Sequence, residues 1–432
     1  MLHVVHKVTL QNGAEGLFID IPTAEVMVFD INFRAGEYLV DADIWEAPHI
    51  MEHLLLGANE QFPSQRSFQA EFEKNGAYCN ASTSVYHINY EAECADFEWE
   101  RIAEMLRLAI TKPLFLEHEF QAEVGNVREE LYSRSNKHLR HLSLAMRQNY
   151  GFVAKTDQQR IDIMDNVTLE HVRDHYARTH VTKNMRFIVA GKLTDKRRAV
   201  LTDIMEQYDL PRGRQRFALP AETPTNTNRP LYLHNESIPN MYFYVDLYLN
   251  KRLSNTKSDA LELLNTILTE TLYSRILGAA REQGLVYSMG SGSHRQRSSS
   301  AWWFGAQVMP DNATALFSVI LSELLRIKNG QIDDEDITIA KSYSLGRHMR
   351  SGQTVGGTAE GYAWRYFFDD EVEDYYQIPK RIEAITKNNM IATANEFFDA
   401  NAYGLGLLGS CGDEFADILS DRLTPLWTKL EA

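Results

Sequence analysis

Two segments of this chain repeat one pattern at one spacing, and this repeat limits the possible folds more than any other feature. In residues 167–191, a Val-Thr pair opens a predicted helix that leads to an apolar strand ending in glycine. Residues 385–409 repeat that order, with an Ile-Thr pair, over an equal length. The predicted strand at residues 27–33 likewise resembles residues 241–247. We interpret the pattern as a degenerate internal duplication of one α+β unit; the alternative is chance similarity of short segments.

A segment of different composition separates the two copies. Residues 211–230 contain four prolines, a run of threonine and asparagine, and few aliphatic side chains. This composition is typical of an inter-domain linker. A chain of 432 residues is also too long for one ordinary hydrophobic core. The sequence therefore predicts two domains joined by this linker.

Composition narrows the class of protein. With 44% hydrophobic and 24% charged residues, the chain has the mixture of a soluble globular protein. A net charge of −15 repels nucleic acid and anionic membranes, so we expect neither as a partner. The N-terminus lacks the apolar core of a signal peptide, which predicts a cytoplasmic protein. Three cysteines without a Cys-x-x-Cys pair predict reduced thiols and no thiolate zinc site.

The strongest chemical signal lies in a predicted helix at residues 43–56, with Asp43 as its N-cap. This helix contains the run His49-Ile50-Met51-Glu52-His53. Residues four apart share a helix face, so both imidazoles can bind one metal ion, and the glutamate reaches the same side. The order is the inverse of the more familiar His-Glu-x-x-His motif. The alternative is a pair of surface or cap histidines on an ordinary helix.

A second histidine pair has the same spacing. His171 and His175 are also four residues apart. No carboxylate partner suggests itself for them, so we expect both on a helix surface.

Two histidines are too few ligands for a catalytic zinc ion, which needs three protein ligands and an open position for water. The predicted helix at residues 117–135 offers Glu123 and Glu130, two turns apart on one face. Two neutral imidazoles and one carboxylate suit Zn²⁺. The ion lowers the pKa of its bound water towards about 7. Glu52, close to the open position but not a ligand, can accept that water's proton.

These residues and their spacing resemble the pitrilysin/insulinase family of zinc peptidases. The resemblance implies that His49, His53 and Glu130 bind zinc and that Glu52 is the catalytic base. It also implies that Glu123, seven residues before the glutamate ligand, orients one of the two histidines through a hydrogen bond.

Other motifs of the first half follow the family's order. Phe-Pro-Ser stands at residues 62–64, Asn-Gly at 75–76 and Asn-Ala-Ser-Thr at 80–83. In the family, the Asn-Ala-x-Thr strand is a sheet edge that takes up substrate by backbone pairing. The resemblance therefore implies that Asn80 and Ala81 bind substrate.

The second half resembles the family more weakly. Residues 281–288 are similar to a family segment, Arg…Gly-Leu-x-Tyr, that contacts substrate, which implies this role for Tyr287. The family arginine stands seven residues before the tyrosine, where this chain has Ala280, and Arg281 is one place off. Residues 263–269 align with the zinc helix but contain no metal-binding pair. We therefore expect the second domain to be non-catalytic.

The length of the chain matches the small, two-domain members that dimerise into a closed chamber, such as the mitochondrial processing peptidase and its bacterial relatives. Pro48, where most small members have alanine, is a departure that some larger members share. The expected fold is α+β, with two homologous domains that are each a mainly antiparallel sheet flanked by helices. We expect a catalytic zinc-binding domain at residues 1–212, a linker at 213–228, and a homologous domain at 229–432 that contributes substrate contacts.

The expected function is that of a zinc-dependent endopeptidase that hydrolyses peptides or unfolded segments inside a closed chamber, as a homodimer. One alternative is a non-catalytic scaffold or assembly subunit, because some family members have lost the motif and serve structurally. Another is the catalytic half of an obligate heterodimer, in which a partner supplies the arginine that Ala280 replaces. The complete ligand set favours the enzyme over the scaffold.

Overall fold

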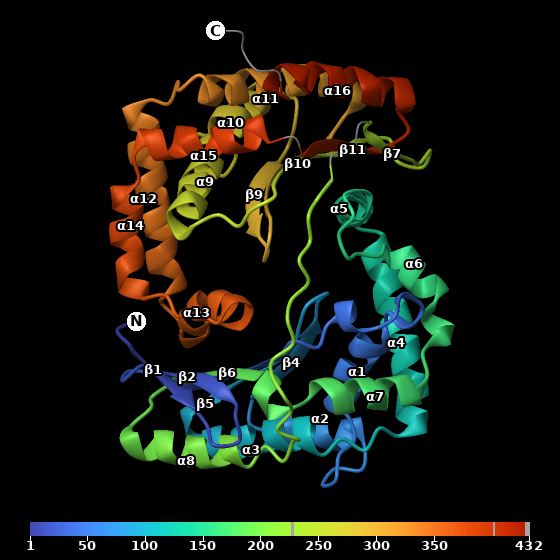
Figure 1. Cartoon of the computed structure of the whole chain (residues 1–432), viewed down its shortest axis with the longest axis vertical. Coiled ribbons are helices and arrows are strands. Elements are labelled where there is room, and N and C mark those ends of the chain that lie inside the picture. The colour runs from blue at the N-terminus through green and yellow to red at the C-terminus, as the bar shows by residue number, and fades with distance from the viewer. Residues whose placement is uncertain (226–228, 401, 428–432) are drawn as a thin grey trace. The chain divides into compact units, whose positions relative to one another are not determined.

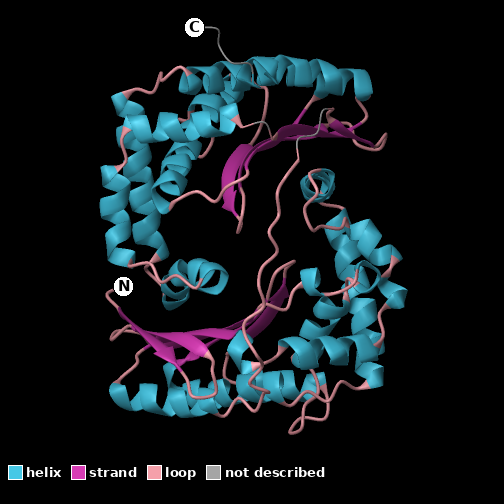
Figure 2. Ribbon diagram, in the orientation of Figure 1, coloured by secondary structure: helices cyan, strands magenta, loops and turns pink. Residues whose placement is uncertain are grey.

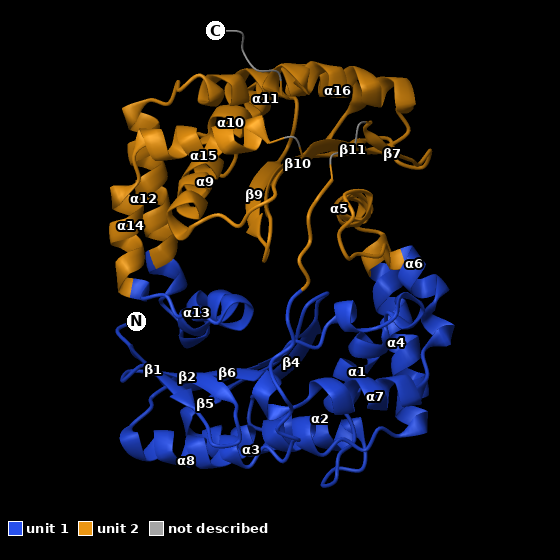
Figure 3. Ribbon diagram, in the orientation of Figure 1, with its two compact units in different colours: residues 1–133, 158–219, 349–375 blue, residues 134–157, 220–348, 376–432 orange. Residues whose placement is uncertain are grey.

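The computed structural model describes residues 1–225, 229–400 and 402–427. The chain divides into two compact units, drawn in different colours in Figure 3. Unit 1 comprises Met1–Ser133, Gln158–Leu219 and Met349–Tyr375, and unit 2 comprises Arg134–Asp157, Pro220–His348 and Tyr376–Ala432. Within the described residues, no helix is long and apolar enough to cross a membrane.

Unit 1 is built on a six-stranded sheet with the order β1-β2-β6-β3-β5-β4. β2 and β6 are parallel, and the other neighbouring pairs are antiparallel. On β3, Met27, Phe29, Ile31 and Phe33 are fully buried against one face, as the predicted alternation requires. The strands are β1 (Val4–Thr9), β2 (Glu15–Asp20), β3 (Val26–Phe33), β4 (Tyr78–Thr83), β5 (Ile88–Ala95) and β6 (Met185–Gly191).

Helices cover the buried face of this sheet, and Figure 2 shows the separation into helices and strands. The main core of unit 1 lies between them and includes Ile50, Leu106, Val127 and Val172, one from each of four helices. The helices of this part of the chain are α1 (Ala47–Leu55), α2 (Gln65–Glu73), α3 (Trp99–Thr111), α4 (Glu117–Ser135), α6 (Asp157–Asp162), α7 (Leu169–Thr179) and α8 (Asp195–Glu206). Short 3-10 turns lie at Glu37–Leu39, Ala42–Ile44, Asp96–Glu98, Met164–Asn166 and Thr182–Asn184.

Unit 2 is built on a five-stranded sheet with the order β7-β11-β8-β10-β9. Its strands are β7 (Leu231–His234), β8 (Met241–Leu249), β9 (Met289–Arg295), β10 (Ser300–Val308) and β11 (Tyr403–Gly409). Its main core, which includes Phe243, Trp302 and Phe397, lies under helices on one face. Those helices are α9 (Asn255–Leu268), α10 (Arg275–Glu282), α11 (Pro310–Lys328), α12 (Asp334–Ser351), α14 (Ile378–Ala384), α15 (Lys387–Asp399) and α16 (Asp413–Trp427), and a 3-10 turn lies at Tyr375–Gln377.

Among the described residues, the second sheet repeats the first except that no strand corresponds to β1. β7 and β11 are parallel like β2 and β6, and each later pair is antiparallel like its counterpart. The helices that precede β6 and β11 both begin with a threonine capping box, at Thr168 and Thr386. Both strands end in a glycine of positive φ, Gly191 at 152° and Gly409 at 156°. The predicted α+β class, with two mainly antiparallel sheets flanked by helices, is confirmed.

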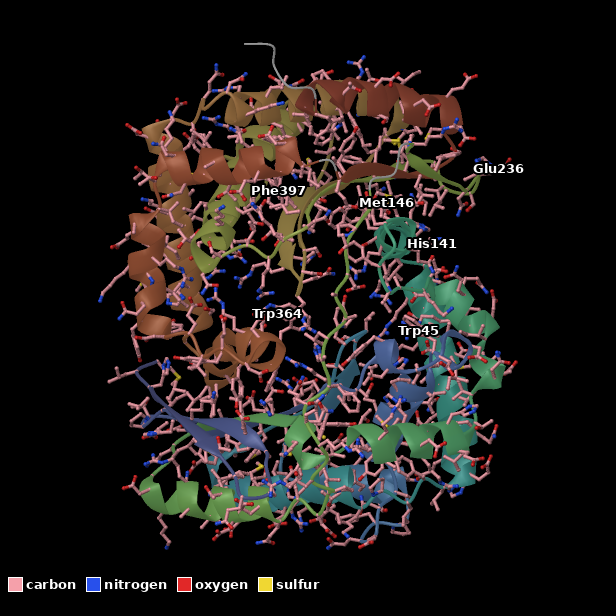
Figure 4. All side chains as sticks on the ribbon, in the orientation of Figure 1. Trp45, His141, Met146, Glu236, Trp364 and Phe397 are labelled. Atoms are coloured by element: carbon pink, nitrogen blue, oxygen red, sulfur yellow. The ribbon has the colours of Figure 1, made fainter. Side chains whose placement is uncertain are left out.

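Each unit takes one helix from the other half of the sequence. α13 (Val355–Asp369) packs on β6 and β3 of unit 1, across the sheet from α3 and α8 (Figure 1). α5 (His138–Asn149) packs on β8 and β11 of unit 2, where Met146, labelled in Figure 4, belongs to the cluster under it. The compact units therefore differ from continuous domains at 1–212 and 229–432 in these two segments. Of the linker expected at 213–228, residues 213–225 form no helix or strand, and 226–228 lie outside the described residues.

Candidate metal centre

α1 carries the histidine motif and begins later than predicted. The helix starts at Ala47 rather than Asp43, because Pro48 is tolerated only in the first turn of a helix, where its missing N–H removes no helical hydrogen bond. Asp43 lies instead in the 3-10 turn Ala42–Ile44 and caps no helix with its side chain. The later start places Glu46 at the N-cap position, one turn before His49.

A carboxylate lies within hydrogen-bond distance of Nδ1 of each motif imidazole. Nδ1 of His49 lies 3.0 Å from Glu46 Oε2, and Nδ1 of His53 lies 2.8 Å from Glu123 Oε2. When Nδ1 donates to a carboxylate, the lone pair of the neutral ring is left on Nε2. Both rings are therefore prepared to bind a metal through Nε2.

Both Nε2 atoms face the same carboxylate of α4. Oε2 of Glu130 lies 3.2 Å from Nε2 of His49 and 3.7 Å from Nε2 of His53. Glu123 and Glu130 reach the same site because residues seven apart are two turns apart on one helix face. Glu129, by contrast, is exposed. Oε2 of Glu130 thus lies beside both Nε2 atoms, at the position expected for the third ligand of a four-coordinate zinc site.

Glu52 is buried on the same side of α1. Donor atoms of His49, Glu52 and His53 lie within 4.8 Å of one another. Oε2 of Glu52 accepts a hydrogen bond of 3.2 Å from Thr83 Oγ1 on β4. Burial raises the pKa of Glu52 and outweighs the opposite effect of the two histidines. A carboxylate with a raised pKa is a stronger proton acceptor, which suits a general base.

Glu46, the carboxylate that contacts His49, belongs to a buried ion pair that the sequence did not predict. Arg160 Nη2 donates to Glu46 Oε2 at 2.9 Å, and Glu37 lies 3.6 Å from the same guanidinium. Burial alone would raise the pKa of Glu46, but the charge of Arg160 and hydrogen bonds from His49 and Arg160 lower it to about 2. Glu46 is thereby kept ionised as the acceptor for His49.

The centre carries an excess of carboxylates around its imidazoles. Burial lowers the pKa of His53, but hydrogen bonds to Glu123 and Glu130 outweigh it and raise the pKa to about 10. The pKa of His49 is raised for the corresponding reason, by Glu130 and Glu46 against burial. The carboxylates therefore stabilise positive charge at the imidazoles, and either protons or a bound cation supply that charge. Two imidazoles and one carboxylate around one point fit Zn²⁺.

The predicted substrate-binding strand is at an edge of the sheet. β4 carries Asn80 and Ala81 and pairs with β5, with Ala81 opposite Tyr90. Among the described residues no strand pairs with its other edge. The unpaired backbone groups of such an edge can accept an extended peptide.

Tyr287 and Arg281, the substrate contacts expected from the second half, lie together in unit 2. The guanidinium of Arg281 is 4.9 Å from the centre of the Tyr287 ring and donates to the Tyr287 carbonyl. Tyr287 is 84% exposed, whereas Ala280 is fully buried in α10. The remaining predicted site residues all belong to unit 1. The structure thus brings the five residues expected at the metal centre together in one unit, and the Tyr287–Arg281 pair in the other.

The site and fold together define a class: a duplicated α+β protein with an inverted His-x-x-Glu-His helix and a glutamate on a following helix. Comparison with known proteins gives the same class. Residues 43–157 match the family described as Insulinase (Peptidase family M16), and residues 166–343 match the Peptidase M16 inactive domain. The chain belongs to the M16, or insulinase, family of peptidases.

Curated relatives share only part of this chain. The insulin-degrading enzyme of Drosophila melanogaster is 23% identical over 181 residues, which is 40% of this chain and 18% of that enzyme. Insulin-degrading enzyme-like 2 of Arabidopsis thaliana is 27% identical over 84 residues, 19% of this chain and 9% of that protein. The matches therefore span less than a fifth of these relatives.

Solved structures are similar over nearly the whole chain. A protease from Helicobacter pylori has a TM-score of 0.82 at 18% identity, covering 94% of this chain and all of that one. A peptidase M16 inactive domain from Pseudomonas fluorescens has a TM-score of 0.79 at 15% identity, covering 95% and 98%. A chain of complex III2 from Candida albicans has a TM-score of 0.79 at 13% identity, covering 97% and all of that chain. At these identities the similarity concerns the fold.

Proposed function

We propose that this protein is a zinc-dependent endopeptidase that hydrolyses peptides or unfolded segments. One observation carries the proposal: Nε2 of His49 and Nε2 of His53 both face Oε2 of Glu130, while each Nδ1 is held by a carboxylate. This arrangement offers three protein donors to one ion, which is the number that a catalytic zinc site uses beside its bound water.

In this proposal His49, His53 and Glu130 would hold Zn²⁺, which when bound would supply a Lewis acid and lower the pKa of water. Glu46 and Glu123 keep the two rings oriented through Nδ1. Glu52 accepts the proton of the attacking water and delivers it to the leaving amine.

The free edge of β4 supports the choice of substrate. Backbone pairing at Asn80 and Ala81 requires an extended chain, which a peptide or unfolded segment offers and a folded protein does not. The partner in this proposal is therefore a polypeptide, and a closed chamber formed by a homodimer would exclude folded proteins.

The rival function is that of a non-catalytic assembly subunit. The similarity to a complex III2 chain concerns the fold and does not favour either function. The complete donor set and the buried Glu52 favour catalysis, since a scaffold needs neither. A heterodimer whose partner supplies an arginine stays a prediction that rests on Ala280 and Arg281.

The test uses the purified full chain. We expect it to hydrolyse a quenched, unfolded peptide, to lose this activity to a chelator, and to regain it on addition of Zn²⁺. A folded protein should resist cleavage, and the same protein should be cleaved after unfolding. Peptide hydrolysis that survives complete metal removal would contradict the proposal, as would an inactive chain that binds one zinc ion per protomer. The mass in solution separates homodimer from monomer.

A further inference from the structure

A cavity of about 430 Å³ lies in unit 1, on the face of the sheet opposite the metal helix. Strands β3, β4 and β5 form one wall, and α13 forms the other. Consecutive residues of a strand point to opposite faces. Ser82 lines the cavity, while the next residue, Thr83, contacts Glu52 on the other face. The cavity and the metal centre are therefore neighbours across the edge strand β4.

The walls of the cavity carry acidic side chains without a matching cation among the described lining residues. Asp30 of β3, Glu91 and Glu93 of β5, and Glu360 of α13 line it. No lysine or arginine is among its described lining residues. The one lining histidine, His87, is neutral at physiological pH, because burial, together with the charges of nearby arginines, lowers its pKa to about 4.

The nearby arginines are already bound. Arg34 donates to the carbonyls of Phe217 and Phe368, at 3.0 and 2.7 Å, and lies 3.4 Å from Asp370. Arg216 donates to the carbonyl of Phe367 and pairs with Asp370. These guanidiniums hold the C-terminal end of α13 and do not line the cavity.

One acidic oxygen of the cavity is left unsatisfied. Oδ1 of Asp30 is buried and has no hydrogen-bond partner among the described residues. Burial raises the pKa of Asp30 to about 7, and the charges of Glu91 and Glu360 act in the same direction, against a hydrogen bond from Asn89. A buried carboxyl oxygen without a hydrogen-bond partner costs free energy that an arriving donor or cation recovers.

The four cavity carboxylates lie on several different elements, and this arrangement does not form a site for a compact metal ion. Among the described residues, no three of the cavity carboxylates gather around one point as the donor atoms of His49, Glu52 and His53 do. The cavity carboxylates are instead spread over two strands and a helix. Trp364 and Phe368, stacked with ring centres 4.8 Å apart, add an aromatic wall, and Trp364 is labelled on α13 in Figure 4. Spread carboxylates beside aromatic faces suit an elongated organic cation.

We propose that this cavity is a substrate subsite that binds a basic side chain, lysine or arginine, of the peptide paired with β4. The proposal rests on the proposed peptidase function and names the substrate class. A peptide strand added to β4 alternates its side chains between the two faces of the sheet. Every second side chain therefore lies on the face of Tyr78 and Ser82, from which the acidic cavity opens.

The experiment compares pairs of quenched peptides that differ only by lysine or norleucine, moved one residue at a time along the sequence. The norleucine peptide has a side chain of similar length without the charge. With the zinc-loaded full chain, kcat/KM should be about tenfold higher for the lysine peptide than for the norleucine peptide. This preference should appear only at every second position of the peptide. The Glu91→Gln/Glu360→Gln variant should bring the lysine-to-norleucine ratio close to one. Glu100→Gln, an exposed change on α3, is the matched control and should keep the wild-type ratio.

A binding measurement separates this proposal from the peptidase function. Labelled lysine and norleucine peptides are bound to zinc-loaded Glu52→Gln chain, with and without the two cavity substitutions, and followed by fluorescence anisotropy. We expect the lysine peptide to bind about tenfold more tightly, and only when the cavity carboxylates are present. Equal binding of both peptides, or a ratio of kcat/KM that Glu91→Gln/Glu360→Gln leaves unchanged, overturns the subsite. Selective binding by a wild-type chain that hydrolyses neither peptide overturns the peptidase function and leaves the subsite standing.

Discussion

Glu130 decides whether the donor cluster is a zinc site. Neighbouring residues of a helix point about 100° apart, so Glu130 reaches the imidazoles while Glu129 is exposed. Glu130→Gln should weaken zinc binding by about a hundredfold or more, since loss of an outer partner alone costs about 10–100-fold. Glu129→Gln is the matched control and should bind zinc like the wild type. Competition with a coloured chelator measures both affinities, and the reverse pattern would reassign the third ligand.

At the residue scale, local geometry could be predicted from the sequence and distant support could not. The spacing of His49, Glu52 and His53 places them on one helix face whatever the fold. Glu46, one turn before His49, could have been found by the same rule. Arg160 could not, because only the tertiary structure brings it to Glu46.

The pair His171 and His175 shows the limit of a spacing rule. His175 was expected on a surface, but it is buried, and its Nε2 lies 2.7 Å from the carbonyl of Ala35. That expectation is wrong because periodicity alone does not tell which face of α7 packs on the core. Its neighbour His171 completes the capping box of α7.

Among the elements, those defined by local signals could be predicted best. α4 has the expected bounds, and residues 80–83 lie in a strand, β4, which forms a hairpin with β5. The positions of α5 and α13 could not be predicted, because an apolar helix face does not specify which sheet covers it. α5 approaches the sheet closely at Gly406 of β11, because a Cβ added to this glycine would lie 2.5 Å from Met146 of α5.

The C-terminal end of α13 is held by one carboxylate among three arginines. Asp370, 39% exposed, pairs with Arg34, Arg186 and Arg216, whose side chains are nearly buried. Asp370→Asn should lower the free energy of unfolding at neutral pH by about 2 kcal/mol, less than the 3–5 kcal/mol of a fully buried pair because solvent screens it. Urea unfolding measures the change. The exposed Glu371→Gln is the control and should have little effect.

The same carboxylate predicts a pH dependence. Burial alone would raise the pKa of Asp370, but the charges of Arg216, Arg186 and Arg34 hold it below its usual value. A lowered folded-state pKa stabilises the fold above the unfolded-state pKa of about 4, and this stabilisation is lost as the pH falls through the folded value. The stability difference between wild type and Asp370→Asn should therefore be full at neutral pH and shrink below about pH 4. A difference that stays constant in acid would contradict the ion-pair account.

For the whole molecule, the exchanged helices make each unit depend on both halves of the sequence. Without α13, a fragment of residues 1–219 exposes an apolar sheet face, and burial of each large apolar side chain is worth about 1.5–3 kcal/mol. We expect this fragment to bind a hydrophobic dye and to unfold without cooperativity, and a fusion to residues 349–375 to restore cooperative unfolding. The residues that α13 contributes to the buried cluster on that face include Val355, Ala359, Tyr362, Tyr366 and Phe367. A fragment that unfolds as cooperatively as the fusion would show that α13 is dispensable.

This exchange brings a helix from the second half of the chain into the unit that holds the candidate metal centre. The metal centre lies in unit 1, yet α13, which forms one wall of the acidic cavity, comes from the second half of the chain. The duplication was visible in the sequence because both copies keep the same cap, strand and terminal glycine. The exchange was not visible, because it depends on the long-range packing of α5 and α13.

The most direct test of the central claim is the Glu52→Gln variant, with zinc content and peptide hydrolysis measured on the same purified sample. Glu52 is assigned as proton acceptor and not as ligand, so the variant should keep one zinc ion per chain and lose hydrolysis by about a hundredfold or more. Circular dichroism checks that the fold is retained. A variant that loses its zinc would make Glu52 a ligand, and one that hydrolyses peptide at the wild-type rate would remove Glu52 from the chemistry; either result contradicts the account.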